Sequence, residues 1–341
     1  MRRWRWATCV VVSALIGYGA VHVDWRSALH VLGRASFAYL AAAMLCNGAS
    51  LVLRGIRWWI FLRAVDGGSL MLAIRGAVVG SGFNNLLVAN GGEAARALFV
   101  SREGGASRTS VVATLALERL FDPICFLLLL VTATFTTPLP SPFMHARAVA
   151  ISVLLFAAFG FLISRRAPTA EVVSATIGGW RAHVRGFRWR VAALATPPRV
   201  ISALACSIGV WMFQLFEYAV VACAAGVQLP FGASVAAMVL INAGLVFRAT
   251  PGGVGYFQLA YATAVSRFGI PTDVAVATAL LIQIVEILPV TLAALAFTAT
   301  RFRGAPRAGG GAAPRFPPVS RGLSYALTPS IVRFSSHDAA S

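Results

Sequence analysis

Residues 84–99 read NNLLVANGGEAARALF, and the interpretation of the whole chain depends on this stretch. It places two asparagines, a glycine pair, a glutamate and an arginine among apolar runs. Hydrocarbon satisfies none of these polar groups, so the stretch either leaves the bilayer or forms a polar site inside it. Gly91 and Gly92 are natural points for the backbone to turn. We therefore predict a turn within the membrane.

The composition around this stretch is typical of a membrane protein. Hydrophobic residues make up 58% of the 341 residues, charged residues make up 12%, and the mean hydropathy is +0.78. A membrane-spanning helix needs roughly 20 apolar residues. Apolar segments near this length occur at about 7–23, 35–53, 70–90, 109–135, 148–163, 201–225, 233–249 and 273–298. We predict an all-α polytopic integral membrane protein with eight apolar segments.

Arginine placement predicts how these segments cross the membrane. All 29 basic residues are arginine, and they lie mostly between apolar segments, which favours topology and headgroup contacts over nucleic-acid binding. Eight full crossings would divide the loop arginines about evenly between the two sides. If 70–108 and 233–267 are re-entrant hairpins, nearly all loop arginines become cytoplasmic, which is the bias of real membrane proteins. We predict about six full spans plus two re-entrant helical hairpins, with N- and C-termini cytoplasmic.

The remaining segments complete a predicted membrane domain over 1–300. The first segment resembles a signal peptide, although a retained first helix is favoured in a chain with later spans. Residues 24–34 suggest a short interfacial helix. Residues 164–200 combine seven arginines with two tryptophans and suit a basic helix on the cytoplasmic surface. Residues 301–341 are rich in Gly, Pro, Ala and Ser, and predict a disordered cytoplasmic tail.

Two parts of the chain, about 70–135 and 233–298, look like repeats. At an offset of 164 residues Arg119 matches Gln283 and Asp122 matches Glu286, and each half begins with an asparagine-containing run and a glycine pair. The predicted topology would orient the halves oppositely. An inverted repeat of this kind builds transporter sites near the membrane midplane. Chance similarity between alanine-rich helices stays open as the alternative.

Polar residues in these halves are the candidate site. Glu118, Arg119 and Asp122 occur as E-R-x-x-D, so that Asp122 shares a helix face with each of the other two. An intramembrane ion pair marks a functional site by default, and a neutral pair that pins helices is the alternative. Glycines of the second hairpin free amide groups for a phosphate or carboxylate, or serve close helix packing. The predicted substrate-binding residues are Asn84, Asn85, Glu93, Arg96, Glu118, Arg119, Asp122, Asn242, Arg248, Gly252, Gly253, Gly255, Gln258, Gln283 and Glu286.

Other side chains give little sign of chemistry. Glu217, with Gln214 three residues earlier, suits a packing contact as well as a site. Histidines and cysteines show no metal-ligand spacing, and no nucleophile lies beside a partner base. We therefore predict no metal, no cofactor and no enzymatic activity. An integral enzyme is kept as a third alternative.

Four motifs carry a family resemblance: RGIRWW at 54–59, NNLLVANGGEAAR at 84–96, ERLFD at 118–122 and PGGVGYFQ at 251–258. At these motifs the chain resembles the lysylphosphatidylglycerol-synthase membrane-domain family, which are flippase-like polytopic proteins. The resemblance implies that the characteristic positions are Glu93, Arg96, Glu118, Arg119, Asp122, Pro251, Gly252, Gly253 and Gly255.

The chain departs from the family pattern at three positions. It has Val88 and Asn90 where the family usually has proline and arginine, and Gln258 where a glutamate is common. Members that make lysyl-lipid carry a further aminoacyl-transfer domain. Only about 40 residues follow the last predicted helix, too few for such a domain, so synthase activity is not expected.

The resemblance and the polar residues together predict a lipid-handling protein. We expect it to move an anionic membrane lipid or lipid-linked headgroup across the bacterial cytoplasmic (inner) membrane through a polar midplane cleft. The alternative is a non-transporting accessory protein that docks an enzyme of lipid modification or of a lipid-linked glycan pathway. The sequence leaves open the lipid, the direction, the energy coupling and the oligomeric state.

Overall fold

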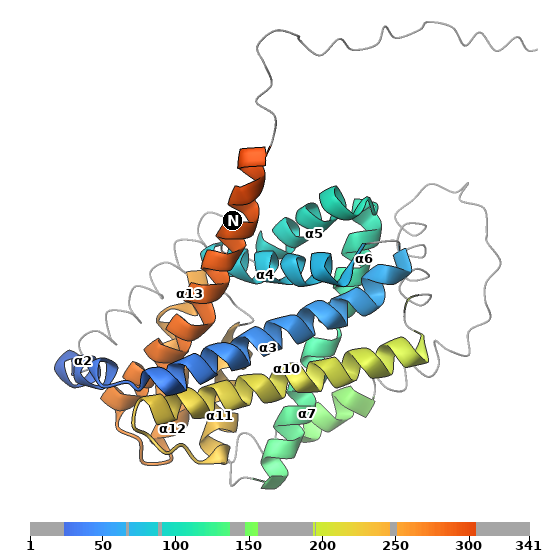
Figure 1. The fold of residues 1–341 in the computed structure, drawn as a ribbon. Coiled ribbons are helices and arrows are strands. Elements are labelled where there is room, and N and C mark those ends of the chain that lie inside the picture. The colour runs from blue at the N-terminus through green and yellow to red at the C-terminus, as the bar shows by residue number, and fades with distance from the viewer. Residues whose placement is uncertain are drawn as a thin grey trace, which may run out of the picture. The chain divides into compact units, whose positions relative to one another are not determined.

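The computed structural model describes residues 24–65, 68–87, 91–136, 147–155, 194, 196–245 and 251–304. The chain divides into two units, Met1–Arg303 and Gly304–Ser341, and the described residues belong to the first except for Gly304. Over these ranges the regular secondary structure is entirely helical (Figure 1). The predicted all-α class is confirmed.

The described helices run from Trp25 to Gly304. In chain order they are α2 (Trp25–Gly33), α3 (Phe37–Leu62), η1 (Arg63–Val65), α4 (Leu70–Leu86), α5 (Gly91–Gly104), α6 (Arg108–Arg119), α7 (Phe121–Thr136), α10 (Pro197–Ala224), α11 (Phe231–Leu245), η2 (Pro251–Gly253), α12 (Tyr256–Ser266) and α13 (Thr272–Gly304). Several begin at side chains that cap the free amides of a first turn. Asp24 Oδ1 accepts a hydrogen bond from the amide of Arg26 at 3.0 Å, which starts α2 where the sequence predicts a short helix.

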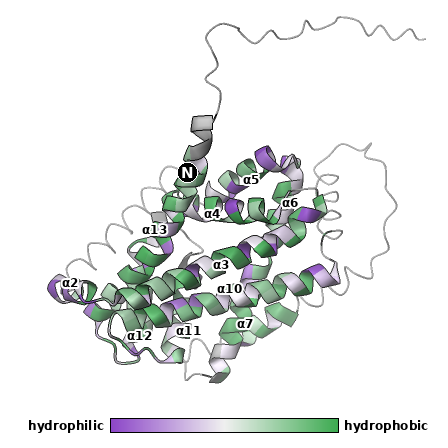
Figure 2. Ribbon diagram, in the orientation of Figure 1, coloured by the Kyte–Doolittle hydropathy of each residue, from purple (hydrophilic) through white to green (hydrophobic). Residues whose placement is uncertain are grey.

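Three of the described helices are long and apolar enough to cross a membrane, namely Phe37–Val65, Pro197–Ala224 and Thr272–Ala299. Figure 2 shows hydrophobic residues along most of their length, whereas α5 carries hydrophilic patches. The chain is therefore a multi-pass membrane protein. The count of six full spans stays a prediction. The segment 7–23 and the second half of 148–163 lie outside the described residues, as do most of 164–200 and all of the tail beyond Gly304.

Two larger hydrophobic clusters hold the described helices together, and a small one around Phe61 and Phe121 joins α3, α6, α7 and α10. α3 and α10 pack along one another over much of their length (Figure 1). The first cluster surrounds the fully buried Trp58 and joins α3 to α4, α5 and α6. The second surrounds Tyr218 and Tyr261 and joins α7 and α10 to α11, α12 and α13. The first cluster thus holds α4, α5 and α6 of the first predicted repeat half, and the second holds the second half together with α7 of the first.

Two pairs of short helices have the form of the predicted hairpins. α4 packs on α5, and α11 packs on α12. The four helices contain 17, 14, 15 and 11 residues. At 1.5 Å per residue none reaches the roughly 30 Å of a hydrocarbon core. Their lengths agree with hairpins that enter and leave on one side, and the re-entrant topology itself stays a prediction.

The single helix predicted over 109–135 is wrong. The structure has two helices there, with α6 ending at Arg119 and α7 beginning at Phe121. Pro123 explains the break, because proline has no amide hydrogen and its ring clashes with the carbonyl four residues earlier, at Arg119. Asp122 therefore lies in the first turn of α7, where the positive end of the helix dipole favours a carboxylate.

The predicted end of the second apolar segment, near 53, is also wrong. α3 continues to Leu62, so that Arg54 and Arg57 belong to the helix rather than to a loop. Charge alone suggested a loop, because an unpaired arginine is costly in hydrocarbon. Carboxylates from other helices compensate Arg57 in the folded protein.

Replacing Gly92 with alanine is expected to destabilise the pair α4–α5. A Cβ at position 92 would overlap the carbonyl oxygen of Gly80 and lie 2.6 Å from the amide nitrogen of Asn84. Overpacking of this kind costs about 1–3 kcal/mol. Thermal unfolding in detergent measures the loss, with Gly48→Ala on α3 as the control because its Cβ would meet nothing within 4 Å. Equal midpoints for both variants would contradict the close approach of the two helices.

Candidate functional site

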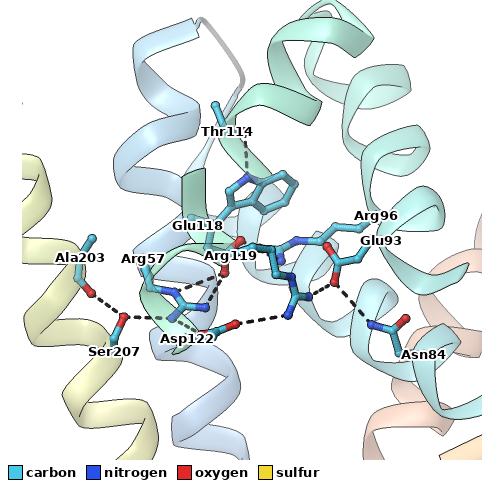
Figure 3. Close-up of polar contacts among 11 residues, drawn as sticks. Arg57, Asn84, Glu93, Arg96, Thr114, Glu118, Arg119, Asp122, Ala203 and Ser207 are labelled. Carbon is cyan, nitrogen blue, oxygen red and sulfur yellow. Dashed lines mark hydrogen bonds and ion pairs between the residues drawn. The ribbon is translucent and has the colours of Figure 1, made fainter. Parts of the chain in front are cut away.

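A buried network of charged side chains lies where α3, α6, α7 and α10 meet (Figure 3). Its centre is Arg57 on α3, which is 2% exposed. Arg57 Nη2 lies 2.9 Å from Glu118 Oε1, and Nη1 lies 2.7 Å from Asp122 Oδ1. Nη1 also donates a hydrogen bond of 2.9 Å to Ser207 Oγ on α10. One guanidinium thus links three other helices to α3.

Arg96 on α5 reaches the same glutamate from the opposite side. Its Nη1 lies 2.9 Å from Glu118 Oε2, so the carboxylate is held between two arginines. The guanidinium of Arg96 stacks over the Trp58 ring at 3.8 Å from the centroid, and the Trp58 indole donates to Thr114 Oγ1 at 3.0 Å. The hydrogen bond to Thr114 holds the Trp58 ring in place, and stacking on that ring holds the guanidinium of Arg96.

Arg119 extends the network to the first hairpin. Its guanidinium pairs with Glu93 on α5, and Nη1 lies 3.2 Å from Asp122 Oδ2. Asn84 on α4 donates to Glu93 Oε1 at 3.4 Å and accepts from the amide of Gly92 at 2.9 Å. The amide of Asn84 therefore caps the start of α5 and orients the carboxylate that holds Arg119.

The charges of this network balance. Its ion pairs join three arginines to three carboxylates, namely Arg57, Arg96, Arg119, Glu93, Glu118 and Asp122. Charges taken out of water are tolerated when they are paired and hydrogen-bonded. The fully enclosed Glu118 fits the pinning role that the sequence left open. Arg119 and Asp122 are more exposed, at 45% and 32% of their side chains.

A polar cavity of about 390 Å³ lies beside the network, and Arg119 and Asp122 form part of its wall. The other polar or charged groups on its wall come from α3, α4, α10, α11, η2 and α13. They are Asn47, Ser50, Arg54, Ser81, Asn84, Asn85, Gln214, Glu217, Asn242, Gly252, Gly253 and Glu286. The cavity is therefore bounded by both hairpins and by the three described helices that are long enough to span a membrane.

Three charged groups of the wall lie outside the balanced network. Arg54 makes no ion pair or hydrogen bond with any residue that the structure describes. Glu286 Oε1 accepts a hydrogen bond of 3.4 Å from Gln214 Nε2. Glu217 is 1% exposed, and among the described residues nothing donates to its buried Oε1.

The predicted repeats make corresponding contacts. Arg119 binds Glu93 in the helix that follows the first glycine pair. Its predicted counterpart, Gln283, accepts a hydrogen bond from Gln258 in the helix that follows the second glycine motif. Gln258 Oε1 in turn accepts from the amide of Gly255 at 2.7 Å. A charged pair in one half thus corresponds to an amide pair in the other, and Gln258 occupies the position where the resemblance expected glutamate.

The structure divides the predicted binding residues into three groups. On the cavity wall lie Asn84, Asn85, Arg119, Asp122, Asn242, Gly252, Gly253 and Glu286. Arg96, Glu118 and Glu93 lie behind the wall in the charge network, where Glu93 of the first hairpin pairs with Arg119. Gly255, Gln258 and Gln283 form the contacts of the second hairpin. Arg248 lies outside the described residues.

Sequence reasoning did not predict Arg54, Arg57 or Glu217 as site residues. The arginines are three residues apart in a long apolar segment, a spacing that puts both on one helix face. That signal was available, but the helix was expected to end at 53. Glu217 was considered and left open, because a lone carboxylate carries no spacing to interpret.

Comparison with known proteins agrees with the motifs and the helices. No curated protein matches the chain significantly. The sequence profile described as lysylphosphatidylglycerol synthase TM region matches residues 5–294. This range covers both hairpins, the charge network and the cavity. The chain therefore belongs to the lysylphosphatidylglycerol synthase TM region family, whose name points to membrane proteins of lipid metabolism.

Proposed function

We propose that this protein moves a membrane lipid, or a lipid-linked molecule, with an anionic headgroup from one leaflet to the other. The observation that carries the proposal is the polar cavity bounded by both hairpins and by α3, α10 and α13. Lipid tails stay in hydrocarbon at no cost, whereas the headgroup needs a polar path. A polar cavity within a bundle of membrane helices offers such a path.

Arg54 is the group that we assign to the headgroup phosphate. Its guanidinium makes no ion pair or hydrogen bond with a described side chain, although it faces the carboxylates of Glu217 and Glu286, and it lies on the cavity wall. Arginine binds phosphate through two parallel hydrogen bonds that carry charge. The cavity of about 390 Å³ lies within the range of roughly 300–1,000 Å³ for small-molecule sites. Its size suits a headgroup whose tails remain outside.

The hairpins are the elements that we expect to move. Their helices are too short to span the bilayer alone. The proposal keeps the inverted repeat, the re-entrant topology and a location in the bacterial inner membrane with both termini cytoplasmic. The corresponding contacts of Arg119 and Gln283 support the repeat. Transport of this kind involves no chemical change in the lipid, so no catalytic role is assigned.

Leaflet exchange in vesicles tests the proposal. Purified protein in vesicles of phosphatidylglycerol and phosphatidylethanolamine is expected to expose fluorescent phosphatidylglycerol of the inner leaflet to an impermeant quencher faster than empty vesicles do. Asp122→Asn is expected to lose most of this exchange while the protein still folds. The variant removes a charge from the cavity wall but leaves Arg57 paired with Glu118 and Arg119 paired with Glu93.

The same experiment separates transport from the alternative role. An exchange rate equal to that of empty vesicles would contradict transport and favour the accessory protein that docks a lipid-modifying enzyme. Copurification of such an enzyme in stoichiometric amounts would then support the accessory role. Full exchange by Asp122→Asn would show that the headgroup does not depend on the part of the cavity wall that Asp122 forms.

A further inference from the structure

Glu217 lies in an environment that does not compensate an ionised carboxylate. It is 1% exposed within α10, a helix long enough to span the membrane. No described residue forms an ion pair with it, and its Oε1 is buried without a hydrogen-bond donor. An ionised carboxylate in this state is expensive, and such groups usually take up a proton instead. Glu217 is one of the residues that line the cavity.

A second carboxylate faces the same cavity from another spanning helix. Glu286 on α13 lies near enough to Glu217 for the two to interact electrostatically. Its Oε1 accepts one hydrogen bond, from the neutral amide of Gln214. Two carboxylates that share a site resist simultaneous ionisation, so one proton bound between them lowers the repulsion.

The surrounding charges leave this pair undercompensated. From α3 it faces the guanidinium of Arg54 and, at Glu217, the thiol of Cys46. From α10 it faces the phenol of Tyr218. From α6 and α7 the wall presents Arg119 and Asp122, which already pair with one another. From α11, η2 and α12 the described lining is Asn242, Gly252, Gly253 and Phe257, without a titratable group. Among the described groups outside the network, the positive charge of Arg54 therefore compensates both Glu217 and Glu286.

We propose that Glu217 and Glu286 form a proton-binding site that takes up a proton when an anionic headgroup occupies Arg54. The inference rests on the proposed function, because it uses Arg54 as the phosphate ligand. When Arg54 turns to the phosphate, its charge no longer compensates the carboxylates. A proton from water then binds a carboxylate oxygen, and it returns to water when the headgroup leaves. Lipid anion and proton thus enter and leave the cavity together.

Infrared difference spectroscopy of the purified protein in detergent detects this proton directly. The probe is a short-chain, ether-linked phosphatidylglycerol, because it lacks the ester carbonyls that overlap the band of a protonated carboxyl group. Its binding is followed separately through the change in intrinsic tryptophan fluorescence, to which Trp211 on the cavity wall contributes. In wild type we expect the carboxyl band to grow when the lipid binds. In Glu217→Gln and Glu286→Gln the response is lost.

Asp273→Asn is the matched control, because Asp273 lies on the same helix as Glu286 but outside the cavity lining. It should respond like wild type. Lipid binding without a change in the carboxyl band would overturn the proposal, as would an unchanged response in both glutamine variants. A growing band in a protein that exchanges no lipid between leaflets would support the proton site and contradict transport. The two proposals therefore fail separately.

Discussion

Replacing Glu118 with glutamine is expected to cost the folded protein about 3–5 kcal/mol, the usual penalty for removing one partner of a buried ion pair. Glu118 is 2% exposed and lies between Arg57 and Arg96. Arg57 retains Asp122, but no other carboxylate of the described residues pairs with Arg96. The variant therefore leaves a buried guanidinium against a neutral amide. The free energy of unfolding in mixed detergent micelles measures the loss.

A double variant separates charge balance from packing. Arg96→Gln together with Glu118→Gln removes one cation along with the anion. The double variant should therefore lose less stability than Glu118→Gln alone. Asp24→Asn, at the exposed start of α2, is the control for loss of a carboxylate outside the network. Wild-type stability of Glu118→Gln would show that the network does not hold α3, α5 and α6 together.

Replacing Arg54 with glutamine is expected to slow leaflet exchange about 10- to 100-fold with little change in stability. Arg54 makes no ion pair with a described residue, so its removal leaves the network paired, and a proton bound by Glu217 and Glu286 replaces the charge that they lose. A hydrogen bond to a charged group contributes about 1.5–3 kcal/mol, and each 1.4 kcal/mol is about tenfold in affinity or rate. The vesicle exchange assay measures the rate, and thermal unfolding measures the stability.

Arg75→Gln is the matched control for Arg54→Gln. Arg75 lies on α4, over the ring of Phe297, and is not part of the cavity wall. It should keep wild-type exchange. Arg54→Lys should recover part of the rate, because it restores the charge without the paired donors of arginine. Equal rates for Arg54→Gln and wild type would exclude Arg54 as the phosphate ligand.

Much of the fold was predictable because it depends on local pattern. Apolar runs located several of the described helices, among them α4, α10, α11 and α13. The predicted turn at the glycine pair is wrong in position, because Gly91 and Gly92 form the first residues of α5. Two boundaries were wrong for identifiable reasons. Pro123 divides the predicted helix over 109–135, and α3 runs past 53 through Arg54 and Arg57. The second error arose because hydropathy treats an arginine in the same way whether or not a distant residue neutralises it.

The candidate site was predictable only in part. ERLFD and the asparagines of the first hairpin were found from their motifs, but Arg57, the residue that links Glu118 to Asp122, was not. Its partners are more than 60 positions away in sequence. The separation of Glu118 from the cavity wall likewise depends on which side of α6 packs against α3 and α5.

The sequence by itself determined that this is a helical membrane protein of the lysylphosphatidylglycerol synthase TM region family, with polar groups inside apolar segments. Hydropathy and short motifs carry that information, because hydrogen bonding within a helix and transfer into lipid are local properties. Only the tertiary structure decided which charges neutralise one another and which remain on the cavity wall. Coulomb interactions depend on distances between helices, and packing alone sets those distances.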